Sequence, residues 1–135
     1  QTVELVDIFI KQCRSILELA VPAWHGAITL VERQDIERVQ KMALHIILGD
    51  QYESYRNALN MTNLVTLDAR RDKLCLKFAK KAEKNNKHKN WFKPKPKVNT
   101  RQVDSKYCST LARTNRLMKS PISYLTTLLN EHYQK

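Results

Sequence analysis

Twelve lysine and arginine residues lie between Arg70 and Lys97, where only two acidic residues accompany them. Clustered ammonium and guanidinium groups neutralise phosphates and release the cations condensed around a nucleic acid. Trp91 and Phe92 stand within this basic stretch, and aromatic rings of this kind stack on unpaired bases. The residue types therefore favour contact with a polyanion, through both its phosphates and its bases.

Each of these two features has a second interpretation. The basic residues could form a solvated surface, although charge of one sign favours binding over the mixed charge of an ordinary exposed face. Trp91 and Phe92 could instead anchor the end of the preceding helix onto the core.

The charge of the chain is strongly segregated. Residues 1–69 hold six lysines and arginines against nine acids, whereas residues 70–135 hold eighteen against four, and the net charge is +11. A basic protein of this kind suits a polyanionic partner. We therefore expect the first half to supply packed structure and the second half to contact the partner.

No catalytic or metal-binding pattern accompanies the basic residues. The three cysteines are widely spaced, without a CxxC pair or a histidine at a metal-ligand offset. The sequence has no glycine-rich phosphate loop and no adjacent aspartates for a two-metal site. We expect no catalytic residue, no metal, no cofactor and no small-molecule substrate.

Composition favours helices and an intracellular setting. Only two glycines and four prolines interrupt 135 residues, of which 42% are hydrophobic, and sheets need more frequent turn residues than this. No stretch approaches the roughly 18 apolar residues that span a bilayer, so we expect no membrane partner and a nuclear or cytoplasmic location. Because the chain begins at Gln1 rather than Met, we expect a fragment of a longer protein.

Four helices must position these residues. Apolar spacing predicts a first helix of about five turns that Pro22 ends. A capping box of Thr29 and Glu32 opens the second helix, which Gly49 closes. Its expected apolar face is Ile36, Val39, Met42, Ala43, Ile46 and Ile47.

Thr66 is the expected cap of the third helix, and Ser120 with Pro121 opens a final one that runs to about Tyr133. The third helix is expected to expose its basic residues on one side: Arg70, Arg71, Lys73, Lys77, Lys80, Lys81 and Lys84. Alternating lysine and proline at 93–97 predicts an extended arm that presents Lys93, Lys95 and Lys97. The weakly patterned stretch that follows adds Arg113 and Arg116.

The predicted fold is all-α. It is a small helical bundle with an extended basic Lys/Pro arm and a short C-terminal helix. The predicted division is a helical domain at 1–90, a basic linker at 91–119 and the final helix at 120–135.

Four segments together resemble one family. They read ILELAVPAWH at 16–25, IERVQKMALHIILG at 36–49, LDARRDKLCLKFA at 67–79 and SPISYLTTLLN at 120–130. In this order they resemble the region that follows the catalytic palm in reverse transcriptases of Jockey-like non-LTR retrotransposons. The resemblance covers nearly the whole chain.

The resemblance implies a polymerase thumb, which grips the template–primer duplex and holds it against the palm. Its implied partners are RNA or an RNA–DNA duplex and the remaining reverse transcriptase domains. The paired palm aspartates are absent from this sequence, so the resemblance implies a chain that binds the duplex but does not polymerise. The candidate backbone contacts that it implies are Arg38, Lys41, Arg70, Arg71, Lys77, Lys80 and Lys81.

The sequence departs from the family at 93–97, where Lys-Pro-Lys-Pro-Lys replaces a hydrophobic–proline segment. This makes the arm more basic than the family pattern requires. An alternative function is a helical protein–protein interaction module, either domesticated from such an element or docking to the other polymerase domains. The apolar content of residues 1–66 favours that alternative.

Overall fold

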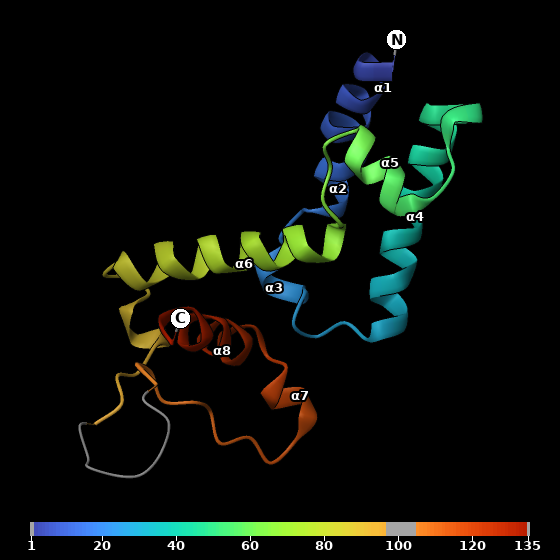
Figure 1. Cartoon of the computed structure of the whole chain (residues 1–135). Helices are drawn as coiled ribbons and strands as arrows, with labels where there is room; N and C mark the ends of the chain where they lie inside the picture. Colours follow the sequence, from blue (N-terminus) through green and yellow to red (C-terminus); the bar gives the residue numbers. More distant parts are fainter. Residues whose placement is uncertain (1, 97–104, 135) are drawn as a thin grey trace. The chain divides into compact units, whose positions relative to one another are not determined.

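The computed structural model of the chain describes residues 2–96 and 105–134 and confirms the all-α prediction (Figure 1). Within these residues there is no strand, only an isolated antiparallel bridge between Pro94 and Tyr107. The α-helices are α1 Thr2–Ile8, α2 Ser15–Leu17, α3 Val21–Trp24, α4 Leu30–Leu48, α5 Tyr55–Met61, α6 Leu67–Lys84, α7 Asn115–Met118 and α8 Pro121–Tyr133. A π-helical segment, Phe9–Arg14, joins α1 to α2, and short 3₁₀ turns occupy Gly49–Gln51 and Lys89–Trp91.

The described residues form two compact units. Unit 1 comprises the described residues within Gln1–Ala20 and Ile28–Asp72, and unit 2 those within Val21–Ala27 and Lys73–Lys135. This division differs from the predicted boundaries at 90 and 119, because α3 and most of α6 belong with the C-terminal residues.

The first helix is shorter than its apolar pattern predicts. Helical structure ends at Leu17, and Ala20 has a left-handed φ of 52° that interrupts the chain before Pro22. Pro22 lies inside α3, where the first helical turn has no backbone acceptor for the missing N–H. Pro22 therefore belongs to a new helical turn instead of ending the first helix.

The second helix is bounded as predicted. The Thr29 backbone N–H donates to the Glu32 carboxylate at 2.7 Å, and the Thr29 hydroxyl accepts from the Glu32 backbone N–H at 3.3 Å. This reciprocal capping box satisfies two N–H groups that have no partner within the helix. Gly49 follows Leu48 with a φ of 51°, which glycine tolerates better than other residues.

The predicted apolar face of α4 is wrong at Val39, Met42 and Ile46, which are exposed, whereas Ile36, Ala43 and Ile47 are half-buried. α4 buries Gln40, Leu44 and Leu48, whereas Met42 and Ile46 are 60% and 78% exposed. The core of unit 1 gathers Leu44, Leu48, Ala58, Tyr52, Tyr55, Leu59 and Leu64. Gln40 can be buried because its amide donates to the Tyr55 hydroxyl at 2.9 Å and to the Val65 carbonyl at 3.0 Å.

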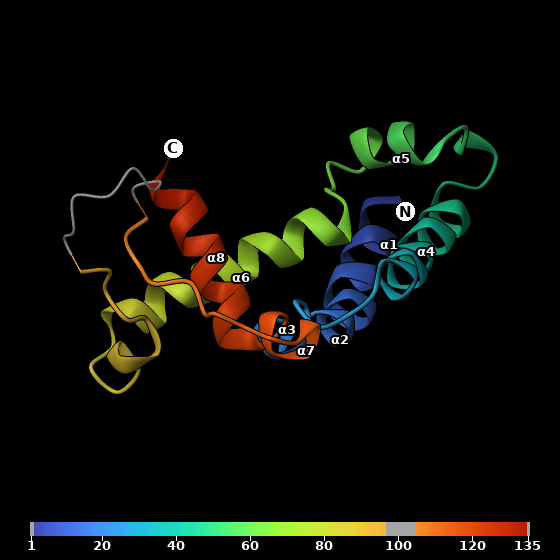
Figure 2. The same cartoon turned by 90° about the horizontal axis from the view of Figure 1, so that it is seen from below.

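In unit 2, α8 packs across α6 (Figure 1), and Figure 2 shows the two helices crossing. Leu125 and Leu129 of α8 are buried in one core with the small residues Cys75 and Ala79 of α6. Helix α3 adds the buried Val21 to this core. Unit 2 thus assembles segments from three parts of the sequence.

A buried amide on α8 contributes to holding the segment around Tyr107 in place. Asn130 accepts from the Tyr107 backbone N–H at 2.9 Å and donates to the Tyr107 carbonyl at 3.0 Å. Both residues are at least nine-tenths buried. The side chain of Asn130 thereby satisfies both backbone groups of Tyr107, as a neighbouring strand would.

Candidate nucleic-acid interface

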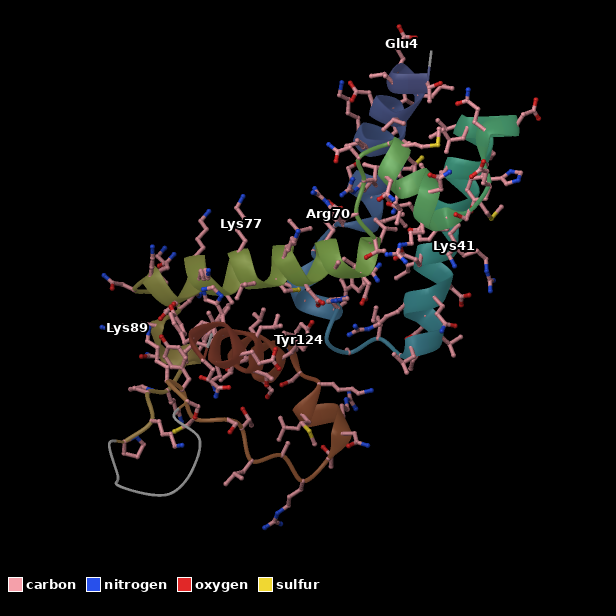
Figure 3. All side chains as sticks on the ribbon, in the orientation of Figure 1. Glu4, Lys41, Arg70, Lys77, Lys89 and Tyr124 are labelled. Carbon is pink, nitrogen blue, oxygen red and sulfur yellow. The ribbon has the colours of Figure 1, made fainter. Side chains whose placement is uncertain are left out.

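The exposed side of α6 carries a stripe of five lysines, which we term the lysine stripe: Lys73, Lys77, Lys80, Lys81 and Lys84. Lys73, Lys80 and Lys81 each lie three or four residues from Lys77, and Lys84 lies three from Lys81, so all five share one face of the helix. The opposite face holds the buried Cys75, Ala79 and Ala82. In Figure 3 the labelled side chain of Lys77 projects away from α8.

The lysine stripe is uncompensated within the described part of the chain. None of its five ammonium groups forms an ion pair or a hydrogen bond with a residue in 2–96 or 105–134. From Lys73 to Lys84 the helix rises about 16 Å, at 1.5 Å per residue. That length matches roughly five phosphate steps along one strand, at 3.4 Å each.

The two arginines before the stripe do not extend it. Arg71 is fully buried, and its guanidinium contacts Asp68 at 3.2 Å, so its predicted place on the exposed side is wrong. Arg70 is half-buried and forms an ion pair with Glu18. Both arginines lie in unit 1 and act there as structural cations.

Arg38 and Lys41, the other implied contacts, are exposed on α4 in unit 1. Arg38 pairs with Asp35 at 3.3 Å, and the Lys41 ammonium lies 5.2 Å from the centre of the Tyr55 ring. Since both are solvent-exposed, these contacts hold them only weakly. They remain accessible to a ligand of unit 1.

The Lys/Pro segment is extended, as predicted, but the described part of it is not a free arm. The Lys95 backbone N–H donates to the Lys106 carbonyl at 3.1 Å, and the Lys93 carbonyl accepts from the Cys108 N–H at 2.9 Å. These bonds flank the bridge between Pro94 and Tyr107. Lys97 lies outside the described residues.

Phe92 is an anchor, which corrects its assignment as a stacking residue. It is 3% exposed, and its ring centroid lies 5.7 Å from that of Tyr107 within the core of unit 2. Trp91 is half-buried against the same core, with its ring 4.3 Å from that of His88. The alternative interpretation, that this pair pins the end of α6, describes both residues.

Arg113 and Arg116 are both exposed, the second of them on α7. Neither forms an ion pair with another described residue. They are available cations of unit 2, although on a segment separate from the lysine stripe.

Sequence reasoning missed a polar cluster around Glu83, which lies on α6. Its carboxylate accepts from the Lys106 ammonium at 2.6 Å, from the Tyr133 hydroxyl at 2.7 Å and from the Tyr107 hydroxyl. The Lys106 ammonium also lies 4.0 Å from the Tyr133 ring centre. No local signal reveals this cluster, because the three donors lie 23 to 50 residues from Glu83 in sequence.

The cluster shifts the ionisation of its members. Partial burial raises the pKa of Glu83, but the hydrogen bonds from Lys106, Tyr107 and Tyr133 outweigh burial and hold that pKa at about 2. The same carboxylate raises the pKa of Lys106. Burial, followed by the bond to Glu83, raises the pKa of Tyr107 to about 12. All four groups therefore keep their ordinary charge states at neutral pH.

No family of known proteins, no characterised protein and no solved structure matched this chain in our comparisons. Within the described ranges, no three histidine, cysteine or acidic side chains lie together as metal ligands would. In those same ranges, every helix is too short or too polar to cross a bilayer. Any functional conclusion therefore depends on the charged surface itself.

Proposed function

We propose that the chain is a non-catalytic nucleic-acid-binding module that grips RNA or an RNA–DNA duplex through its phosphates. The observation that carries this proposal is the lysine stripe on α6, which is of one charge and uncompensated among the described residues; four of its lysines are exposed and Lys80 is half-buried. Without base-reading side chains on that face, binding depends on charge and shape and has little sequence preference.

The family resemblance of the sequence adds a context to this proposal. A polymerase thumb contacts the template–primer duplex and leaves the chemistry to the palm. The chain would then be the thumb and post-thumb part of a reverse transcriptase of the Jockey-like non-LTR type. The lysine stripe supplies the backbone contacts that such a role requires.

Salt dependence of binding tests the proposal. Five phosphate contacts predict that log Kobs for a duplex falls with log [salt] with a slope of about −4.5. The variant K77Q/K81Q should lower the magnitude of that slope by about 2. A charge-matched control, K11Q/R56Q, removes two exposed cations from unit 1 and should leave the slope nearly unchanged. A flat slope, or no binding near 50 mM salt, would overturn the proposal.

A second candidate function is protein docking through unit 1. Helix α4 exposes Met42 and Ile46, which with Lys41, His45 and Tyr52 line a shallow hollow. Exposed apolar surface of this kind marks interaction sites, and the remaining polymerase domains are the partner that the resemblance suggests. Sedimentation separates the two candidate functions. Self-association without nucleic-acid affinity favours protein docking, and a monomer that binds duplex favours nucleic-acid binding.

A further inference from the structure

Unit 2 contains a pocket of about 560 Å³ beside the C-terminal end of α6. Its size falls within the roughly 300–1,000 Å³ typical of small-ligand sites. The residues that line it are Glu83, Lys89, Asn90, Phe92, Lys93, Pro94, Lys106 and Tyr107.

The pocket combines an apolar floor with a positive rim. Phe92 and Tyr107 are almost fully buried and form the floor with the exposed ring of Pro94. Three lysines face one carboxylate, which leaves two positive charges in excess. The carboxylate of Glu83 is occupied by Lys106 and the two tyrosines, so Lys89 and Lys93 supply the excess charge.

These two lysines are available to a ligand. Both are exposed, and neither side chain forms an ion pair or hydrogen bond with another residue of the described chain. Asn90, between them in sequence, is also exposed and offers an amide that both donates and accepts. A flat apolar group with a polar edge and an attached anion satisfies all three features, and a nucleotide has that chemistry.

The pocket is within reach of the lysine stripe. Lys84, the last lysine of the stripe, precedes Lys89 by five residues, so their Cα atoms are at most about 18 Å apart. In Figure 3 the labelled Lys89 lies at the C-terminal end of α6. A strand that follows the stripe can therefore enter the pocket within a few nucleotides.

We propose that this pocket holds an unpaired nucleotide at the end of a bound strand. The base contacts the floor of Phe92, Pro94 and Tyr107, its edge meets Asn90, and its phosphate pairs with Lys89 and Lys93. This inference rests on the proposed function, because the strand must first be held along α6. It assigns the lysine stripe to the duplex and the pocket to the strand end.

The test compares the full chain on two RNA duplexes at one salt concentration, a blunt duplex and the same duplex with a three-nucleotide overhang. We expect the overhang to bind about fivefold more tightly, the low end of the gain that base–aromatic contact gives, because Phe92 and Tyr107 expose only 3% and 7% of their surface. A 2-aminopurine in the overhang should change its fluorescence on binding.

Three variants locate the effect. K89Q/K93Q should abolish the overhang preference, and N90A should reduce it without a change in charge. The charge-matched K73Q/K77Q should weaken both duplexes equally and keep the preference. The floor residues are left intact, because Phe92 and Tyr107 belong to the core.

The outcomes separate this inference from the proposed function. Duplex binding without an overhang preference, or a preference that K89Q/K93Q retains, overturns the pocket assignment alone. Absence of binding to either duplex overturns both proposals. Saturable binding of free uridine monophosphate without an overhang preference would identify a mononucleotide site and overturn the strand-end assignment.

Discussion

The carboxylate of Glu83 accepts a hydrogen bond from the ammonium of Lys106 at 2.6 Å, across 23 residues of sequence. The pair joins the last turn of α6 to the segment that bridges Pro94. It also holds the only carboxylate among the residues that line the pocket. One ion pair therefore connects two segments of unit 2 and also neutralises the carboxylate of the pocket.

Replacement of Glu83 by Gln should lower the free energy of unfolding by about 2 kcal/mol, because charge-assisted bonds from Lys106 and the two tyrosines become neutral ones. Urea denaturation monitored by circular dichroism measures the change. Glu131→Gln, on an exposed carboxylate of α8, is the matched control and should shift stability by less than about 0.5 kcal/mol. Equal effects of the two substitutions would contradict the role of Glu83.

Stability should also depend on pH through this residue. The pKa of Glu83 is lowered from 4.5 to about 2 in the folded chain, so the unfolded state binds the proton first as acid is added. The contribution of Glu83 is thus complete above about pH 5 and is lost as the pH falls toward 2. The stability difference between wild type and Glu83→Gln should shrink over that range. A difference that stays constant down to pH 2 would refute this assignment.

Asn130→Ala should destabilise unit 2 by about 2 kcal/mol, because it leaves the buried N–H and carbonyl of Tyr107 without their partner. Hydrogen exchange at the Tyr107 amide should accelerate more than at amides in the middle of α4. Asn86→Ala, in an exposed turn, provides the control. Unchanged exchange at Tyr107 would argue against the amide as its anchor.

Gly26→Ala tests a close approach in unit 2. A Cβ atom there would lie 2.6 Å from Cγ of Tyr124, which requires the ring or the backbone to move and should cost about 1–3 kcal/mol. A second change, Tyr124→Ala, removes the obstructing ring, so the two substitutions together should cost less than the sum of the single ones. Additive costs in a double-mutant cycle would show that the ring is not the obstacle.

Arg71 and Lys77 should separate folding from binding. Arg71→Gln removes a fully buried cation that contacts Asp68, and it should cost about 2–3 kcal/mol of stability. Lys77→Gln removes an exposed cation of the stripe, so it should weaken duplex binding and leave thermal unfolding almost unchanged. Two variants that behave alike in both measurements would contradict this distinction.

Local signals account for the correct part of the prediction. The capping box of Thr29 and Glu32, the glycine at 49 and the cap formed by Thr66 each act within a few residues, and all three are present. Such signals predict where helices begin and end, because each satisfies backbone groups in its own turn. The exposed lysines of α6 follow from the same short-range periodicity.

The errors arise where distant contacts decide which side of a helix is buried. α4 turns Gln40 inward because Tyr55 and the Val65 carbonyl satisfy its amide, and a pattern of apolar residues cannot reveal this. Arg71 is buried by the same kind of compensation from Asp68. The pocket was missed because the bridge of Pro94 with Tyr107 creates it, and single-sequence spacing contains no information on that pairing.

The polar cluster around Glu83 also bears on the order of folding. Its donors arrive from positions 23, 24 and 50 residues away, so the chain must close these loops before any of the bonds can form. We therefore predict that the cluster completes late, after the transition state. Changes at Glu83 should therefore shorten the lifetime of the native state and leave the refolding rate nearly unaltered.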